Sequence, residues 1–347
     1  MYNTTVNTYF STFISGFSDV VQKTLPTLLP NVTIVSLLDG LVLFETTAPV
    51  ERVKHIGYFN NSFLLITRLT KTEGMEPYHI VKKLSADLDL SEIAPLLPEK
   101  KHGTFRVVVS KENELTHVDK SLIRTTQEKI MHETYLTVDP LKADYEFWFL
   151  IRSEAEAFFG VRITGLSTRG GKQAEKGELR SELAYFLAIL SSPKADDIIL
   201  DPFAGHGAIP SQRAYLQEYK HIIAGDADPL LISKLRQRLR HLPETEVLQM
   251  DALRMKPIAD HSITTIITDP PWGIFDKTVS DYNAFYTNML REFKRVLSQN
   301  GVVVVLTAQK EILLQAGAVV GFAIQEKYDI LVSGKKAAVY KLTASQE

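Results

Sequence analysis

Strand-like and helix-like segments alternate strictly along the second half of the chain. Predicted strands lie at 197–200, 221–224, 246–248, 263–268 and 302–306, and predicted helices at 178–190, 208–216, 229–239 and 281–297. Strands that alternate with helices in this way predict a parallel, doubly wound α/β sheet. The end of the chain differs, because two strand-like runs at 322–332 and 337–342 flank a Ser333-Gly334 turn. This pattern predicts an antiparallel hairpin at one edge of a seven-stranded sheet.

The first predicted strand of this half ends in Asp201 and leads into a turn that contains Gly205 and Gly207. Open parallel sheets bind ligands at the carboxyl ends of their strands, and glycine lets the backbone approach a ligand closely. The third glycine of the dinucleotide-binding fingerprint is absent, since the stretch where it would stand holds no glycine and runs into Ser211 and Gln212. The turn therefore predicts a cofactor site but disfavours NAD.

Acidic residues also follow the next two predicted strands. The second strand ends at Asp226, where a carboxylate can accept hydrogen bonds from ribose hydroxyls. The third ends at Asp251, which can accept from an adenine amino group. Each acid alone is more often a helix cap or a solvated strand end. Three acids at three successive strand ends, without a phosphate-binding loop, predict a pocket for an adenosine that carries no phosphates.

The fourth predicted strand runs into Asp269-Pro270-Pro271-Trp272. Two prolines restrict the backbone and remove two N–H donors, so the Pro270 carbonyl and the Asp269 carboxylate can both face the site as acceptors. Such acceptors suit an exocyclic amino group, and Trp272 offers a flat face for an extruded base. Taken alone, the motif could be a rigid turn with a core tryptophan. Together with the three acids, it predicts alkylation of an amino group.

Composition narrows the chemistry further. The chain has no cysteine, which excludes a thiol nucleophile and Cys-ligated metal, and with it the thiolate-dependent methylation of pyrimidine C5. The formal charge of -2 means that any nucleic-acid binding must come from local patches. The start lacks the pattern of a secretion signal, and apolar runs such as 302–306 are far too short to cross a bilayer. We expect a cytoplasmic protein that neither associates with a membrane nor binds a metal ion.

The first half of the chain reads as α+β, in small mixed units. Predicted strands lie at 8–13, 32–37, 41–46, 104–109, 146–151 and 158–163, with helices at 16–23, 77–97 and 119–134. The pair at 32–37 and 41–46 predicts a hairpin that turns at Asp39-Gly40. The segment 165–177, which holds four glycines and few apolar residues, predicts a linker between the halves.

The strand-end acids and the Asp-Pro-Pro-Trp motif resemble the class I S-adenosylmethionine (SAM)-dependent methyltransferases, in the group that methylates amino nitrogens. The resemblance covers about 178–342 and implies a Rossmann-like domain. It places the cofactor at Asp201, Phe203, Ala204, Gly205, Gly207, Asp226, Ala227, Asp251, Ala252 and Asp269. It places the target base at Asp269, Pro270, Pro271 and Trp272, which would be the catalytic residues.

The N-terminal half is similar to the ferredoxin-like plus THUMP arrangement of tRNA guanine-N2 methyltransferases. This resemblance implies a ferredoxin-like domain at 1–72, a THUMP-like RNA-binding domain at 73–165 and the methyltransferase domain at 166–347. The lead-in to the last domain departs from the family at Ser181, where proline is usual, and its glycine turn holds His206 in place of a small residue or cysteine.

The resulting hypothesis is methyl transfer from SAM to the exocyclic N2 of a guanosine in tRNA by a monomeric enzyme. The residues expected to bind RNA flank the linker: Arg162, Arg169, Lys172, Lys176 and Arg180. A second basic cluster, Lys234, Arg236, Arg238 and Arg240, lies on one predicted helix and is read first as a solvated face. Three alternatives stay open: N6-adenine methylation of DNA or RNA, guanine-N2 methylation of rRNA, and a noncatalytic RNA-binding subunit.

Overall fold

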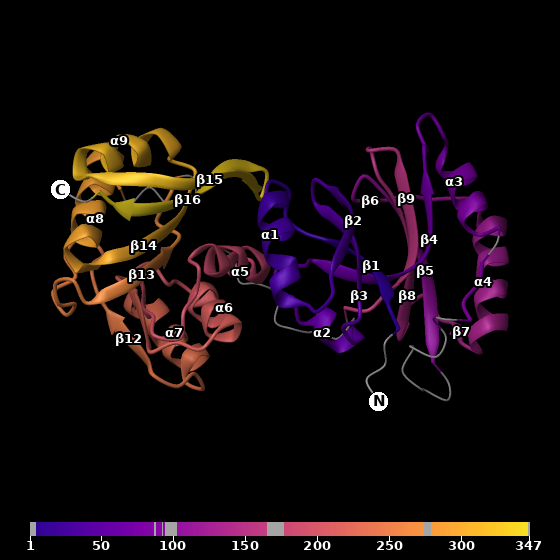
Figure 1. The fold of residues 1–347 in the computed structure, drawn as a ribbon, viewed down its shortest axis with the longest axis horizontal. Coiled ribbons are helices and arrows are strands. Elements are labelled where there is room, and N and C mark those ends of the chain that lie inside the picture. The colour runs from indigo at the N-terminus through magenta and orange to yellow at the C-terminus, as the bar shows by residue number, and fades with distance from the viewer. Residues whose placement is uncertain are drawn as a thin grey trace. The chain divides into compact units, whose positions relative to one another are not determined.

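The computed structural model describes residues 5–86, 88–91, 93, 103–164, 177–273 and 279–345. The chain divides into two compact units. Unit 1 comprises Met1–Phe13 with Val21–Gln173, and unit 2 comprises Ile14–Val20 with Ala174–Glu347. Each unit is built around its own β-sheet (Figure 1).

Unit 1 contains a sheet with the strand order β2-β3-β1-β4-β9-β8-β5-β6, in which β7 also pairs with β5. Its strands are β1 (Asn7–Thr12), β2 (Thr33–Leu38), β3 (Leu41–Thr46), β4 (Asn61–Thr70), β5 (Thr104–Lys111), β6 (Glu114–Leu115), β7 (Thr137–Val138), β8 (Tyr145–Ile151) and β9 (Glu156–Arg162). Its helices are α2 (Val50–Lys54), α3 (Pro77–Leu84) and α4 (Lys120–Thr134), and α1 (Ser18–Leu28) spans the boundary with unit 2. The first part follows the β-α-β-β-α-β order of a ferredoxin-like unit.

The sheet of unit 1 runs without a break across the predicted boundary at residue 72. The connection is the antiparallel pairing of β4 with β9, which joins Thr70 to Glu156 and Phe63 to Arg162. On one face, Phe10 stacks on Phe63 and on Phe158 across the boundary, with ring centroids 4.6 Å and 5.2 Å apart. A shared sheet and a shared aromatic core make the two predicted N-terminal domains parts of one compact unit.

Several predicted elements of unit 1 need correction. The hairpin at Asp39-Gly40 is confirmed, with Gly40 at φ 87°. The predicted helix at 77–97 ends at Leu84: the side chain of Asp89 accepts a hydrogen bond from the Ser91 amide, so residues 89–91 turn instead. Residues 87, 92 and 94–97 of that prediction lie outside the described residues. The sequence patterns missed β4 and α2 altogether.

Unit 2 contains the predicted seven-stranded sheet, with the order β12-β11-β10-β13-β14-β16-β15 among the described residues. Its strands are β10 (Ile198–Asp201), β11 (His221–Asp226), β12 (Thr245–Gln249), β13 (Ile263–Thr268), β14 (Leu297–Thr307), β15 (Phe322–Val332) and β16 (Lys335–Ala344). Its helices are α5 (Ser181–Leu190), α6 (Ala208–Leu216), α7 (Pro229–Leu239), α8 (Tyr282–Val296) and α9 (Lys310–Val320), of which α9 was not predicted. The terminal hairpin is confirmed, since β16 runs antiparallel to both β14 and β15.

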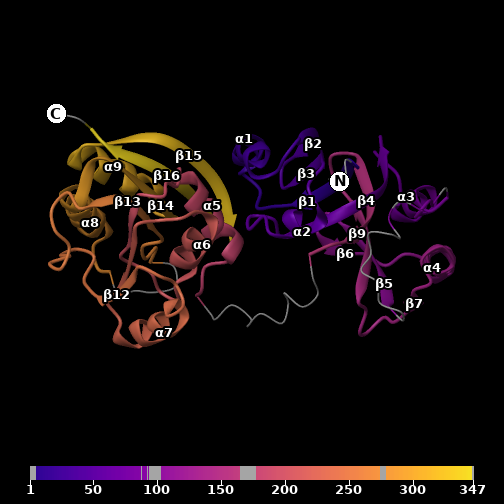
Figure 2. The same ribbon diagram turned by 60° about the horizontal axis from the view of Figure 1, so that its bottom comes forward.

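Helices cover both faces of the unit 2 sheet, with α5, α6 and α7 on one side and α8 and α9 on the other (Figures 1 and 2). The sheet order reverses between β10 and β13, which are parallel neighbours although two strands separate them in sequence. In open α/β sheets the ligand site lies at the carboxyl ends of the strands where this reversal occurs. Those ends are Asp201 and Thr268, directly before the two motifs that the sequence singled out.

Candidate active site

The turn after β10 holds the Asp201 side chain against the neighbouring strand. Asp201 Oδ1 accepts hydrogen bonds from Thr268 Oγ1 at 2.9 Å and from the Phe203 amide at 3.2 Å. Gly205 and Gly207 both have positive φ, 51° and 84°, a conformation that costs little only for glycine. The Gly207 amide donates to the Ala204 carbonyl at 2.7 Å and closes the turn before α6 begins.

Asp201 carries an unsatisfied acceptor in a buried place. Its Oδ2 is inaccessible to solvent and has no hydrogen-bond partner, and its side chain is almost fully buried. Burial is the main cause that raises the pKa of Asp201 to about 8; the negative charges of Asp269 and Asp226 act in the same direction, and the two hydrogen bonds oppose them. A buried carboxyl with a spare oxygen is costly unless a donor or a cation meets it. The β10 end therefore fits a ligand with a positively charged or donating group.

Asp226, at the end of β11, is tied into the same turn. Its Oδ2 accepts a hydrogen bond from the Gly205 amide at 3.1 Å, and its Oδ1 accepts from the Asp228 amide at 2.9 Å. Asp228 in turn caps α7 by accepting from the Leu230 amide. The glycine turn and the second strand-end acid thus form one hydrogen-bonded structure.

The end of β12 lies beside the end of β11. The Met250 amide donates to the Asp226 carbonyl at 3.0 Å, and Gln249 Nε2 donates to the Ala227 carbonyl at 3.2 Å. Asp251 is exposed and accepts from the Leu253 amide at 2.9 Å, while its neighbour Ala252 is buried. The predicted ribose and adenine residues therefore follow adjacent strands.

Asp269 follows β13 and is held by its own motif. Trp272 Nε1 donates a hydrogen bond to Asp269 Oδ1 at 2.8 Å, so the indole edge orients the carboxylate. Burial raises the pKa of Asp269 to about 7, and the hydrogen bond from Trp272 opposes this. Gly273 ends the motif at φ 76°, and a side chain there would collide with the Tyr282 ring. The motif is a rigid turn that presents a carboxyl group whose pKa lies close to neutral pH.

Three further residues support the Asp-Pro-Pro-Trp turn, and the sequence analysis missed them. Gln309 Nε2 donates to the Trp272 carbonyl at 2.6 Å. Tyr286 Oη, which is buried, lies 2.7 Å from Thr307 Oγ1 and donates to the Pro271 carbonyl at 3.4 Å. A signal was available for Thr307 and Gln309, because Thr307 ends β14, the next strand along the same sheet edge.

Two of the five predicted RNA-binding residues, Arg162 and Arg180, lie within the described residues. Arg162 lies within unit 1, is 5% exposed and donates to Glu146 Oε2 at 2.6 Å, so an internal carboxylate occupies its guanidinium. That placement contradicts a role for Arg162 in contacting phosphate. Arg180 lies in unit 2, is 57% exposed and approaches Glu182 at 3.4 Å. Arg169, Lys172 and Lys176 lie outside the described residues.

Two kinds of feature are absent from the described residues: a metal-binding cluster and a membrane-spanning helix. No cluster of three or more His, Asp or Glu side chains there is arranged to hold a metal ion. None of the described helices has both the length and the apolar character needed to span a bilayer.

Comparison with known proteins supports the methyltransferase reading of unit 2. The family model UPF0020, described as an RMKL-like methyltransferase domain, matches residues 169–335. The tRNA (guanine(6)-N(2))-methyltransferase THUMP3 of Mus musculus is 32% identical over 180 residues, which cover 47% of this chain and 36% of that protein. The tRNA (guanine(6)-N2)-methyltransferase of Thermus thermophilus is 28% identical over 245 residues, covering 69% of this chain and 72% of that one.

The likeness to solved structures extends over both units. The crystal structure of TrmN from Thermus thermophilus aligns with a TM-score of 0.76 and 23% identity, over 98% of this chain and all of that one. This match confirms the predicted Rossmann-like methyltransferase fold, preceded by an α+β region. Matched segments span 36% to 64% of the length of the first three curated relatives.

Proposed function

We propose that this chain transfers a methyl group from S-adenosylmethionine to the exocyclic N2 of a guanosine in tRNA. The observation that carries the proposal is the pair of strand ends at the sheet reversal. There β10 presents Asp201 with an unsatisfied oxygen, and β13 presents Asp269, which is oriented by Trp272. One carboxyl suits a cationic cofactor and the other an amino acceptor, so donor and acceptor sites lie on adjacent strands.

The residues present fit S-adenosylmethionine. The spare Asp201 oxygen is an acceptor for the ammonium of its methionine part, and a side chain at Gly205 would point into open space that a ligand can use. Asp226, Ala227, Asp251 and Ala252 follow β11 and β12, where ribose and adenine lie in sheets of this order. When bound, the cofactor supplies an electrophilic methyl group on a sulfonium, and the chain supplies alignment.

The acceptor side uses groups that the motif already orients. Trp272 holds one Asp269 oxygen, which leaves the other oxygen and the Pro270 carbonyl as acceptors for the two N–H bonds of an exocyclic amine. Accepting both hydrogens directs the nitrogen lone pair at the methyl group and stabilises positive charge as it develops on nitrogen. Alignment of this kind can contribute about 7–11 kcal/mol to lowering the barrier.

The tRNA substrate and guanine N2 specificity rest on relatives and on the N-terminal half. Relatives that match the catalytic segment are named tRNA guanine-N2 methyltransferases in a mammal and in a bacterium. We assign 1–72 as a ferredoxin-like domain, 73–165 as a THUMP-like RNA-binding domain and 166–347 as the methyltransferase domain. The β-α-β-β-α-β order at the start of unit 1 supports the first assignment.

The test is incubation of the full chain with tritiated SAM and an unmodified tRNA transcript, followed by nucleoside analysis. We expect label in N2-methylguanosine, and none with the Asp269→Ala variant. Label in N6-methyladenosine would support the adenine alternative, and label only on rRNA would show that rRNA, not tRNA, is the substrate. SAM binding without transfer to any of these RNAs would contradict the proposal.

A further inference from the structure

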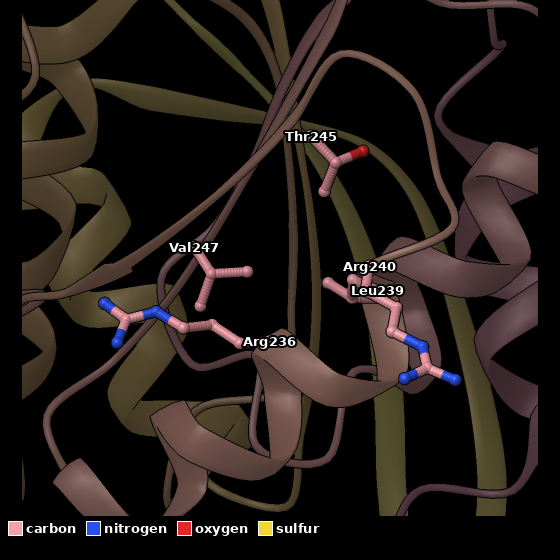
Figure 3. Close-up of a pocket in the computed structure, with 5 residues that line it drawn as sticks. All are labelled: Arg236, Leu239, Arg240, Thr245 and Val247. Atoms are coloured by element: carbon pink, nitrogen blue, oxygen red, sulfur yellow. The ribbon is translucent and has the colours of Figure 1, made fainter.

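A small surface pocket lies at the edge of unit 2, away from the strand ends that form the candidate active site. It has a volume of about 160 Å³ and lies between the last turns of α7 and the edge strand β12. Its lining residues are Arg236, Leu239, Arg240, Thr245 and Val247 (Figure 3). Leu239 is buried, and Thr245 and Val247 are half-buried, so the two arginines are its charged and exposed part.

Both guanidinium groups are available to an external anion. Arg236 and Arg240 are four residues apart on α7, which places them on one face of the helix. Neither makes a hydrogen bond or an ion pair with another residue in the described part of the chain. By contrast, Arg238 between them pairs with Glu178, and Arg213 on α6 is buried against Asp197.

Neighbouring carboxylates do not neutralise this face. Helix α7 itself contains no acidic residue, and Asp228 lies at its opposite end as the N-cap. Glu246 on β12 alternates with Thr245 and Val247, so its side chain projects from the other face of the strand, where it lies 3.7 Å from His221. Glu244, directly before β12, is exposed and forms no ion pair with either arginine in the described part of the chain.

The two arginines point in different directions. In Figure 3 their side chains leave α7 on opposite sides of the pocket, and the two guanidinium groups do not converge on one point. A single small anion would engage only one of them. A chain of anions that passes along the helix would engage both, and the edge strand β12 adds backbone groups without a strand neighbour among the described residues.

We propose that this surface, the α7–β12 edge, binds the phosphate backbone of the RNA substrate. The inference rests on the proposed function and adds a second contact with RNA beside the base-binding turn. Helix α7 begins at the strand-end side of the sheet, where Asp228 caps it, and runs about 16 Å away from it. RNA whose target base lies at Asp269 extends well beyond this distance, and phosphate contacts of this kind fix its position without reading its sequence.

The test measures RNA affinity of the full chain by fluorescence anisotropy with a labelled unmodified tRNA transcript, between 50 and 200 mM salt. In the Arg236→Gln/Arg240→Gln variant, loss of two phosphate contacts should weaken binding by about tenfold and lower the slope of log affinity against log salt by about 1.5–2. The Arg236→Lys/Arg240→Lys variant keeps the charges and should keep most of the slope. A matched control, Arg291→Gln/Lys336→Gln, removes two exposed charges elsewhere in unit 2 and should change neither quantity.

Unchanged affinity and slope in the glutamine variant would overturn the inference, as would an equal effect in the control. Failure of the proposed function has a different signature, because methyl transfer by the wild-type chain is measured in parallel. RNA binding without transfer would contradict the proposed reaction and leave the α7–β12 edge to be judged by affinity alone. A wild-type chain that does not bind RNA would refute both.

Discussion

The charge on Asp269 can be removed with little change in shape by the Asp269→Asn substitution. Asparagine keeps an oxygen that can accept the 2.8 Å hydrogen bond from Trp272 Nε1, so the turn should persist. What is lost is the negative charge that stabilises positive charge developing on the acceptor nitrogen. Removing one such preorganised group costs about 2.7–4 kcal/mol, so we expect single-turnover methylation at saturating SAM to fall by about 10²–10³-fold.

The same carboxyl should set the pH dependence. Because burial raises the pKa of Asp269 to about 7, only about a tenth of it is ionised at pH 6. The ionised form is the active one, so kcat/KM should rise about tenfold per pH unit below 7 and level off above it. The asparagine variant should lack this step. Persistence of the step in that variant would show that another group titrates.

Stability should change in the opposite direction to activity. The pKa of Asp269 in the folded state lies above the ordinary aspartate value of 3.8, so the folded protein holds this proton more tightly than the unfolded chain. Free energy of unfolding is therefore lost as pH rises from about 4 to about 7, by at most about 4 kcal/mol. The asparagine variant escapes this loss and should have a higher thermal midpoint than the wild type at pH 8, with a smaller difference at pH 5.

Asp260→Asn is the matched control, because Asp260 is 66% exposed and pairs with Arg295, which is not part of the motif. It should leave the rate and its pH profile unchanged and should not raise the thermal midpoint. Wild-type activity in Asp269→Asn, or a lower thermal midpoint at pH 8, would refute the reasoning. The first outcome would show that the Asp269 charge has no part in the mechanism, and the second would show that this charge stabilises the fold.

Two further substitutions test the surrounding framework. Gln309→Ala removes the donor to the Trp272 carbonyl, a hydrogen bond of about 0.5–1.5 kcal/mol, and should lower single-turnover methylation by about 2- to 12-fold while SAM affinity by calorimetry stays unchanged. Gly205→Ala places a methyl group in open space at φ 51°, so the thermal midpoint should fall by only a few degrees, whereas calorimetry should show clearly weaker SAM binding.

The sequence predicted the fold of unit 2 well because its signals are local. The helices 208–216 and 229–239 and the strands 263–268 and 322–332 have the predicted bounds. Each has a glycine or an acidic residue directly at one of its ends, which is a short-range determinant. Helix α9 was missed because Gln309 gives it no side-chain cap and its apolar residues show no clear helical face.

The fold of unit 1 was harder to predict because its strands pair with strands that are distant in the sequence. Strand β4 lies between β1 and β9, and its pairing with β9 joins residues about 90 positions apart. Nothing in the local sequence of β4 specifies those neighbours. The Arg162 prediction failed for the same reason: a basic residue beside a linker reads as exposed until the pairing of β8 with β9 brings it near the buried Glu146.

In the candidate site, the strand-end residues were predictable and their contacts were not. Asp201, Asp226 and Asp269 follow from the rule that parallel strands end on one side of a sheet. The hydrogen bond from Thr268 to Asp201, and those from Gln309 and Tyr286 to the proline turn, depend on the register of β13 with β10 and β14. Register is a property of the assembled sheet, so it is available only from the structure.

The two carboxyls with raised pKa values are coupled, and the coupling has a kinetic consequence. Asp269 raises the pKa of Asp201, so a cation that binds at Asp201 should in turn favour the ionised form of Asp269. Free enzyme and SAM complex should then titrate differently: the pH step in kcat/KM for SAM should lie near 7, and the step measured at saturating SAM should lie lower. Such a shift means that cofactor binding prepares the acceptor site. Coincident steps in the two profiles would mean that the two strand ends act independently.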